Sequence, residues 1–280
     1  MSKIGIDIGG TSVKGILLSD NNEIIKEFTH PTYGKEGREV ILKSVFTVID
    51  GLFDDGVTRI GVSSAGNINP FSGVCVYATD NLKGFTGLDL KSVIETRYGV
   101  KTSVDNDAIC ALKAEARNYE SKNVVMITFG TGIGCGVLSG GNIIRGKNFD
   151  GGRLGHLTLV PGGRPCNCGK RGCVEAYLSC TALAFKSKEQ FGYDLSTKDL
   201  FRLYKEKNIT AIEILDEFSY YLNVFLDNVR TAYAPDVIVL GGGLCKDAEI
   251  LLSLIKVKDD IQFAKYDNNA GALGALIDEF

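Results

Sequence analysis

Short runs of alternating apolar residues open the chain and predict a meander of strands. The first run is followed by the turn Gly9 to Thr11, and a second turn at Asp20 to Asn22 separates the next two runs. Beyond them, apolar residues recur at helical spacing and then form one more buried run. Strands are therefore predicted over residues 3–7, 13–18, 23–28 and 59–63, and a helix over 36–53.

The same arrangement recurs later in the chain. A predicted strand over 124–129 is followed by a glycine turn and by strands over 134–138 and 142–144. The segment GVLSGGNII at 136–144 matches GILLSDNNEII at 15–25. Repetition of one strand–turn–hairpin unit indicates an internal duplication, so we expect two lobes with a cleft between them.

The remaining pattern sets the expected lobe boundaries. Polar residues near 115–122 separate the two repeats. We expect a small N-terminal lobe over 1–117, joined by a C-terminal helix over 269–280, and a large lobe over 118–268. Other predicted elements are helices over 108–117, 174–188 and 210–234 and strands over 102–104 and 236–240.

Composition then narrows the class of protein. The 280 residues are 44% hydrophobic and 23% charged, enough to bury a core, and the net charge is −3. No basic stripe indicates a nucleic acid partner. The sequence shows neither a membrane-spanning run nor a signal peptide, so a cytoplasmic protein is expected. In a reducing compartment, the eight cysteines favour free thiols or metal ligands over disulfides.

Three glycine turns follow apolar strands and are candidates for binding ATP. Glycine lets backbone amides approach phosphate oxygens, and a threonine hydroxyl adds a donor. The third turn, 241–243, could lie flat against an adenine. A single turn of this kind is more typical of hairpin chemistry, but three together favour a nucleotide. The predicted cofactor-binding residues are Asp7, Gly9, Gly10, Thr11, Lys14, Gly130, Thr131, Gly132, Gly241, Gly242 and Gly243.

Asp7 ends the first predicted strand, just before its glycine turn. A carboxylate at that position could orient a hydrated Mg²⁺ through water. The alternative is an aspartate that only caps the turn.

Four residues have the spacing of a metal site: His156, Cys166, Cys168 and Cys173 form H-x9-C-x-C-x4-C. Three thiolates and one imidazole suit tetrahedral zinc. Because no ligand position is left for an activated water, the zinc would be structural. The alternative is a group of free thiols, but the clustering of Cys and His in one loop favours metal.

Five stretches of the chain together resemble the ROK family (repressor, open reading frame, kinase), and in particular its bacterial glucokinases and N-acetylmannosamine kinases. They span nearly the whole chain, and the zinc loop is the most specific of them. The stretches are DIGGTSVKG at 7–15, DNDA at 105–108, TFGTGIGCG at 128–136, LGHLTLVPGGRPCNCGKRGCVE at 154–175 and PDVIVLGGG at 235–243.

The resemblance implies an α/β, actin-like or hexokinase-like, two-lobed ATPase fold, in which a ribonuclease H-like domain is duplicated and a zinc-binding loop is added. It also implies ATP-dependent, Mg²⁺-assisted phosphorylation of a hexose or N-acetylhexosamine at the 6-hydroxyl, as in glucokinases, by a homodimer. Alternative substrates are N-acetylmannosamine, fructose, allose and mannose.

Two rival functions stay open. Part of the family consists of repressors with an added N-terminal helix-turn-helix domain, so a non-catalytic sugar-sensing regulator is one alternative. The first predicted strand begins at Lys3, which leaves no room for such a domain and favours an enzyme. The other alternative is a different actin-like ATPase, such as an acetate-kinase-like enzyme.

The resemblance places the catalytic base at Asp107. Phosphoryl transfer to a sugar needs a carboxylate to accept the hydroxyl proton, and Asn106 can both donate to and accept from hydroxyls. An Asn-Asp pair could equally cap the helix over 108–117. By resemblance, the sugar-facing residues are Gly66, Asn81, Asn106, Asp107, Arg153, His156 and Glu175.

Arg153 departs from the family pattern. Family glucokinases usually have Glu at this position, and N-acetylmannosamine kinases have His. Glu accepts hydrogen bonds from sugar hydroxyls, whereas Arg only donates. A guanidinium could bind an acetamido carbonyl, or it could pair with a surface carboxylate such as Asp150 and leave the sugar untouched.

Overall fold

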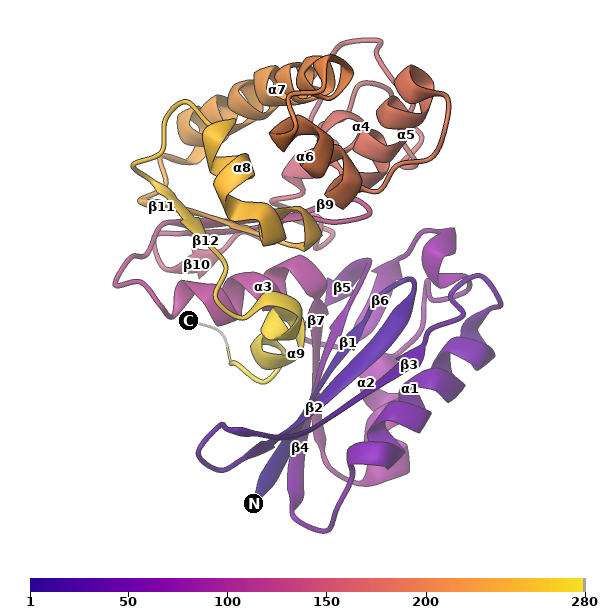
Figure 1. The fold of residues 1–280 in the computed structure, drawn as a ribbon. Coiled ribbons are helices and arrows are strands. Elements are labelled where there is room, and N and C mark those ends of the chain that lie inside the picture. The colour runs from indigo at the N-terminus through magenta and orange to yellow at the C-terminus, as the bar shows by residue number, and fades with distance from the viewer. Residues whose placement is uncertain (279–280) are drawn as a thin grey trace. The chain divides into compact units, whose positions relative to one another are not determined.

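The computed structural model describes residues 1–278 and divides the chain into two compact units. Unit 1 contains Met1–Glu120, Asn142–Gly152 and the C-terminal segment from Lys265, and unit 2 contains Ser121–Gly141 and Arg153–Ala264. Figure 1 shows a mixed sheet with helices in each unit. The short segment Asn142–Gly152 groups with unit 1 although its neighbours in sequence belong to unit 2.

The sheet of unit 1 follows the predicted meander and then continues with parallel strands. The order is β3-β2-β1-β4-β7, with the first two pairings antiparallel and the last two parallel. The hairpin β5 (Asn67–Asn69) and β6 (Val74–Tyr77) lies outside this sheet. The strands are β1 (Ser2–Ile8), β2 (Ser12–Ser19), β3 (Ile24–Pro31), β4 (Val57–Ser64) and β7 (Lys101–Asn106).

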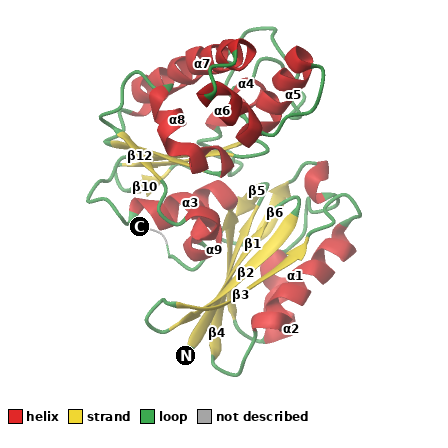
Figure 2. Ribbon diagram, in the orientation of Figure 1, coloured by secondary structure: helices red, strands yellow, loops and turns green. Residues whose placement is uncertain are grey.

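Helices cover both faces of this sheet (Figure 2). Ile4, Ile6 and Ile8 alternate along β1 and share a core with α1 (Arg38–Leu52) and α2 (Leu90–Tyr98). On the opposite face, α9 (Ala270–Gly274) contacts the sheet and packs on α3 (Asp107–Ala116). The period of two along the strands therefore divides the apolar residues between two layers of helices.

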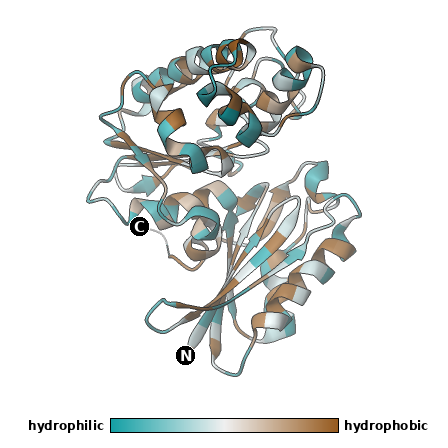
Figure 3. Cartoon of the chain, in the orientation of Figure 1, coloured by the Kyte–Doolittle hydropathy of each residue, from teal (hydrophilic) through white to brown (hydrophobic). Residues whose placement is uncertain are grey.

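Hydrophobic and hydrophilic residues both occur along α1 (Figure 3), in keeping with a helix that covers one face of a sheet. Its buried apolar side chains, Ile41, Val45, Val48, Ile49 and Leu52, stand at i, i+4, i+7, i+8 and i+11 and so share one face of the helix. The predicted helix over 36–53 is thereby confirmed, to within two residues at its start.

Unit 2 repeats the strand order of unit 1. The second sheet follows β10-β9-β8-β11-β12, again with an antiparallel hairpin, β8–β9, and with β11 parallel to both β8 and β12. The last four strands of this order belong to unit 2, whereas the short edge strand β10 lies in the 142–152 segment. The matching order is the observation expected of an internal duplication. The strands are β8 (Val124–Phe129), β9 (Ile133–Ser139), β10 (Asn142–Ile143), β11 (Val237–Gly241) and β12 (Ile261–Phe263).

The helices of unit 2 correct one prediction and confirm another. The helix predicted over 174–188 is two helices, because Ser179 is extended and its hydroxyl accepts a hydrogen bond from the Ala182 amide, which starts a new helix. The helix over 210–234 is confirmed as α7. The helices are α4 (Glu175–Leu178), α5 (Cys180–Phe191), α6 (Thr197–Lys205), α7 (Ile209–Tyr233) and α8 (Ala248–Ser253).

The C-terminal helix predicted over 269–280 is shorter than expected. Only Ala270–Gly274 is α-helical, and the amides of Leu276 and Ile277 then bond to carbonyls three residues back, as in a tightening turn. Residues 279–280 lie outside the described part. Within residues 1–278, no helix combines the length and the apolar character that a membrane span needs.

Candidate functional site

The parallel strands of unit 1 end at one edge of its sheet. The register pairs Asp7 on β1 with Ser63 on β4, and Ser63 with Asp105 on β7. The segments that follow these three residues therefore leave the sheet side by side. Open α/β sheets bind ligands outside the carboxyl ends of their strands, so this edge is the candidate site of unit 1.

Asn106 and Asp107 form the turn from β7 into α3. The Asn106 side-chain oxygen accepts hydrogen bonds from the amides of Ala108 and Ile109, at 3.0 and 3.2 Å, so Asn106 caps the helix. Its amide nitrogen donates to the carbonyl oxygen of Gly66 and to Oδ1 of Asp107, both at 2.8 Å. The predicted cap is thus confirmed, and it ties together three residues that the resemblance placed at the sugar.

The carboxyl group of Asp107 is held in a defined orientation. Its Oδ1 also accepts a hydrogen bond from the Ala108 amide at 2.8 Å. Burial, together with the nearby charge of Asp7, raises the pKa of Asp107 to about 6, although hydrogen bonds from Ala108 and Asn106 act to lower it. A carboxylate with a pKa close to neutral is suited to accept a proton and release it again.

Asp7 lies at the same sheet edge. Burial raises its pKa, and this effect outweighs the hydroxyl of Ser63, which donates a hydrogen bond to Asp7 Oδ1 at 2.6 Å, and the charge of Lys14. Lys14 faces Asp7 across the β1–β2 pair. A carboxylate with few neutralising groups around it suits the coordination of a hydrated cation.

The first glycine turn is fixed from beneath by a buried threonine. The Thr32 hydroxyl donates to the carbonyl oxygen of Gly9 at 2.6 Å. Gly10 lies beside Asn81, which belongs to the short 3₁₀ turn Asp80–Leu82, and Thr11 is exposed. The turn and Asn81 therefore form one continuous surface of unit 1.

The other two glycine turns come together within unit 2. They follow β8 and β11, which are parallel neighbours in the sheet. Gly242 has a φ of +90° and lies against the backbone of Phe129. Because Phe129 is the residue before Gly130, this contact brings the two turns together. Thr181 and Cys180, at the start of α5, hold the 130–132 turn through hydrogen bonds to the carbonyls of Thr131 (2.8 Å) and Gly130 (2.9 Å).

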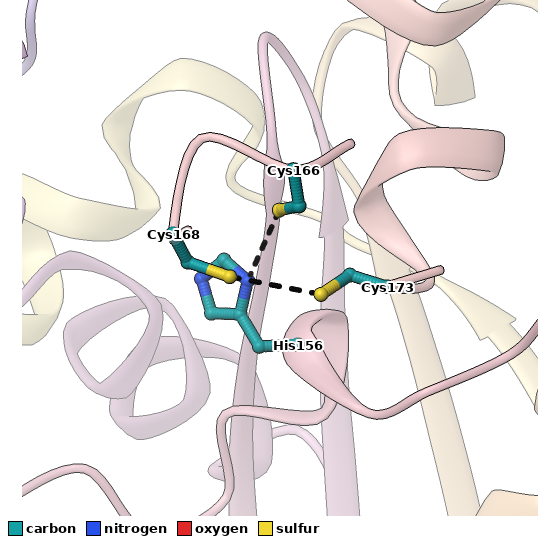
Figure 4. Close-up of side chains that lie close together, drawn as sticks. All are labelled: His156, Cys166, Cys168 and Cys173. Atoms are coloured by element: carbon teal, nitrogen blue, oxygen red, sulfur yellow. Dashed lines mark hydrogen bonds between the residues drawn. The ribbon is translucent and has the colours of Figure 1, made fainter. Parts of the chain in front are cut away.

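The predicted metal ligands form one cluster in unit 2 (Figure 4). Nδ1 of His156 lies 3.7 Å from Sγ of Cys166, and Sγ of Cys168 lies 3.6 Å from Sγ of Cys173. All four candidate ligand atoms lie within 4.8 Å of one another. The ligand atoms of tetrahedral zinc are about 3.5–3.8 Å apart, given bonds of about 2.0–2.3 Å, so the donor set and its spacing suit zinc.

Glu175 and Arg153 flank this cluster. Glu175 begins α4, and its Oε2 accepts a hydrogen bond from the Ile133 amide at 2.9 Å, while its Oε1 lies 3.7 Å from Sγ of Cys166. Burial lowers the pKa of His156, and the positive charge of Arg153 lowers it further. Within the described part of unit 2, the structure gives the Arg153 guanidinium no hydrogen bond or ion pair.

Sequence reasoning missed three residues that support the candidate site of unit 1: Ser63 beneath Asp7, Thr32 beneath the glycine turn, and Asp105 beneath Asn106. The only sequence signal for Ser63 is its polar side chain near the end of an otherwise apolar stretch of β4. Thr32 and Asp105 are contacted by residues 23 and 40 positions away, and no local pattern in the sequence indicates such a contact.

Comparisons with known proteins agree with this arrangement. A model of the ROK family matches residues 3–277. A glucokinase of Halalkalibacterium halodurans is 32% identical, with 97% of this chain and 92% of that protein aligned. A xylose repressor of Bacillus subtilis is 26% identical, with 90% of this chain and 67% of the repressor aligned. The crystal structure of a ROK hexokinase from Thermus thermophilus is 30% identical, with a TM-score of 0.81 over 98% of this chain and 96% of that one.

Proposed function

The chain belongs to the ROK family. We propose that it transfers the terminal phosphoryl group of ATP to the 6-hydroxyl of a hexose or N-acetylhexosamine. The observation that carries the proposal is the Asn106–Asp107 turn: a buried carboxylate whose pKa is raised to about 6, oriented by a capping asparagine. A glucokinase and a hexokinase among the similar proteins support the same reaction.

In the proposed reaction, Asp107 is the general base. Its Oδ1 is engaged by Asn106 and Ala108, so Oδ2 is the oxygen that takes the proton of the sugar hydroxyl. The hydroxyl oxygen then forms its bond to the γ-phosphorus, the bond from that phosphorus to the bridging oxygen breaks, and ADP leaves with the electron pair. Positioning supplies most of the remaining acceleration.

The glycine turns are proposed to hold the nucleotide. Gly10, Thr11 and Thr131 are exposed in these turns, where backbone amides and hydroxyls suit phosphate oxygens. The exposed glycines at 242 and 243 suit the flat face of adenine. Asp7 would hold Mg²⁺ through water, and the ion would neutralise phosphate charge. Lys14, opposite Asp7 in the sheet, adds a positive charge on the same side.

Zinc is proposed as a structural ion held by His156, Cys166, Cys168 and Cys173. Four protein ligands leave no open position, so the ion would stiffen its loop and take no part in the chemistry. Since Nδ1 of His156 faces the sulfurs, Nε2 is the nitrogen proposed to contact the sugar. Glu175, which follows the last cysteine by two residues, would then have its carboxylate fixed by the same loop.

The proposed sugar contacts are Gly66, Asn81, Asn106, Asp107, Arg153, His156 and Glu175. Arg153 favours a substrate with an acceptor near C1 or C2, such as the acetamido carbonyl of an N-acetylhexosamine, because a guanidinium only donates. Family resemblance further suggests a cytoplasmic homodimer, which light scattering at several protein concentrations would test.

The proposed reaction is tested by coupled ADP release with glucose, mannose, allose, fructose, N-acetylglucosamine and N-acetylmannosamine. At least one sugar should be turned over, and Asp107→Asn should lower kcat by about 10²–10⁴-fold while sugar binding by calorimetry stays intact. Near-normal kcat in the variant would remove Asp107 from the mechanism. Sugar binding without turnover by the wild-type protein would instead favour a sugar-sensing regulator.

A further inference from the structure

Unit 1 contains a buried ion cluster that the proposed reaction does not use: Asp105, Lys113 and Arg145, called here the Asp105 cluster. The Arg145 guanidinium donates to both carboxylate oxygens of Asp105, at 2.9 and 2.8 Å, and Nζ of Lys113 lies 2.8 Å from Oδ2. The three side chains are 4%, 7% and 12% exposed for Asp105, Lys113 and Arg145. The cluster is therefore almost fully removed from water.

Charges that are buried this deeply are costly unless they are paired and hydrogen-bonded. Burial acts to raise the pKa of Asp105, but Arg145 and Lys113 outweigh it and hold the pKa below its usual value. Asp105 is therefore ionised at neutral pH and is balanced by two cationic side chains. A hydrophobic trio of similar volume could fill the same space, so a role beyond packing has to come from what the carboxylate contacts.

Asp105 begins a chain of hydrogen bonds that reaches the proposed base. Its Oδ1 accepts a hydrogen bond from the backbone amide of Asn106 at 2.8 Å. The side chain of Asn106 then donates to Oδ1 of Asp107 and to the carbonyl of Gly66, both at 2.8 Å. A displacement of Asp105 would therefore be passed to the base and to a proposed sugar contact.

Arg145 connects this chain to a closed loop. The amide of Gly151 donates to the carbonyl of Arg145 at 2.7 Å, so residues 145–151 return on themselves. Phe149 in this loop packs edge-to-face on Phe71, and the two ring centroids are 6.2 Å apart. Phe71 lies in the turn between β5 and β6. The loop is thus attached to the base-bearing turn at one point and to the hairpin that follows Gly66 at another.

We infer that Asp105 and Arg145 are positioning residues for the kinase reaction, through which the 145–151 loop sets the orientation of Asn106 and Asp107. The inference rests on the proposed function. The bidentate geometry is essential to it, because a planar fork fixes the angle of the carboxylate, whereas a lysine supplies only a point charge.

The test compares Arg145→Lys, which keeps the charge and loses the fork, with Arg145→Met, which loses both. Arg145→Lys should lower kcat and raise the KM for sugar, so that kcat/KM for sugar falls by about 10- to 100-fold, with the KM for ATP within about twofold of wild type. Arg145→Met should lower kcat/KM for sugar further than Arg145→Lys does, because lysine keeps the positive charge that methionine lacks. If Arg145→Met does not fold, Arg145→Lys alone decides.

The matched control is Arg230→Lys in unit 2. Arg230 also makes a bidentate ion pair, with Asp260 at 2.7 Å from both nitrogens, and it contacts none of the proposed site residues. The Tm of the Arg230→Lys variant should fall, while its kcat and its KM values for sugar and ATP stay at the wild-type level. An equal loss of kcat in both variants, or unchanged kinetics in Arg145→Lys, would overturn the positioning role.

Hydrogen exchange separates this inference from the proposed reaction. In Arg145→Lys, amides of residues 103–112 should exchange faster than in wild type, whereas Arg230→Lys should leave them unchanged. This readout needs no turnover: wild type without activity on any sugar would defeat the proposed function, and unchanged exchange at 103–112 would defeat the positioning role.

Discussion

At the scale of single residues, Asp107 differs from an exposed aspartate in its pKa and in the hydrogen bonds to one of its oxygens. An aspartate in water has a pKa of about 3.9, whereas burial and the charge of Asp7 raise the pKa of Asp107 to about 6. The raised pKa makes this carboxylate a stronger base, and it also makes its ionisation unfavourable to the folded state.

We therefore expect the pH dependence of kcat/KM to show an acid limb near pH 6. Above this pH Asp107 is ionised and accepts the hydroxyl proton, and below it the protonated group is inactive. The measurement is ADP release between pH 5 and 8 in overlapping buffers. A rate that stays constant down to pH 5 would show that no group with this pKa acts as the base.

The same shift has a consequence for stability that needs no substrate. Because the folded-state pKa is above the unfolded one, Asp107 favours folding when protonated, and this advantage is lost as the pH rises from about 4 through about 6. Asp107→Asn keeps an oxygen acceptor for Asn106 and Ala108 and does not titrate. The wild type should therefore lose stability relative to Asp107→Asn as the pH rises from about 4 through about 6, so the difference in free energy of unfolding, variant minus wild type, should increase.

Arg153 is the residue expected to decide between sugars. Arg153→Glu should shift preference towards glucose, because the new carboxylate accepts from hydroxyls, with a change of about 5- to 150-fold in the ratio of kcat/KM values. The sugar panel described above measures it. Arg171→Glu is the control: it makes the same charge change in the neighbouring loop, at an exposed side chain that donates to the Gly162 carbonyl.

Unchanged ratios in Arg153→Glu would mean that Arg153 does not contact the sugar. A shift of the same size in Arg171→Glu would mean that net charge, and not a specific hydrogen bond, sets the preference.

At the scale of elements, the proposed nucleotide turns depend on how closely two strand ends approach. Gly242 has a φ of +90°, and a Cβ there would overlap with the backbone of Phe129. Alanine at this position is disfavoured both by its backbone conformation and by the lack of space. The parallel pair β8–β11 can place both turns together only because this residue has no side chain.

Gly242→Ala is accordingly expected to raise the KM for ATP by about tenfold or more and to lower Tm, with a smaller effect on the KM for sugar. Its control is Gly243→Ala, where φ is not positive and a Cβ would meet no atom within 4 Å. The control should keep wild-type KM values. Equal effects at both positions would argue against the close approach as the cause.

At the scale of the whole molecule, one strand order is used twice, and in each copy a glycine turn joins the two strands of the first hairpin. Only unit 2 carries the Cys/His cluster among residues 1–278. The proposed zinc should therefore stabilise unit 2 directly and leave the sheet of unit 1 unaffected.

Elemental analysis of protein purified without chelator should find one zinc per chain. Its removal should speed hydrogen exchange across 153–179 and raise the KM for sugar, while peptides of β1, β2 and β4 stay protected. Cys168→Ser should reproduce the effect, and Cys180→Ser, outside the cluster, should retain the metal. Zinc-free protein with normal exchange and kinetics would contradict the proposed site.

Much of this architecture could be predicted because the signals are local. Alternation in residues 2–31 and 124–143 specified both hairpins, and the spacing of three cysteines and one histidine specified a cluster that the structure brings within 4.8 Å. Local signals failed where a single residue overrides a helical pattern, as Ser179 does between α4 and α5. They also failed for the 142–152 segment, which groups with unit 1 through contacts distant in sequence.

The period of each strand and helix and the cap at Asn106 could be read from the sequence alone, because these features depend on neighbours a few residues away. Folding was needed to place Asp7 near enough to Asp107 to raise its pKa, and to bring Arg145 to Asp105. Electrostatic shifts and buried ion pairs depend on distance and burial in the folded chain. Partners 40 to 100 residues apart leave no periodic signature in the sequence.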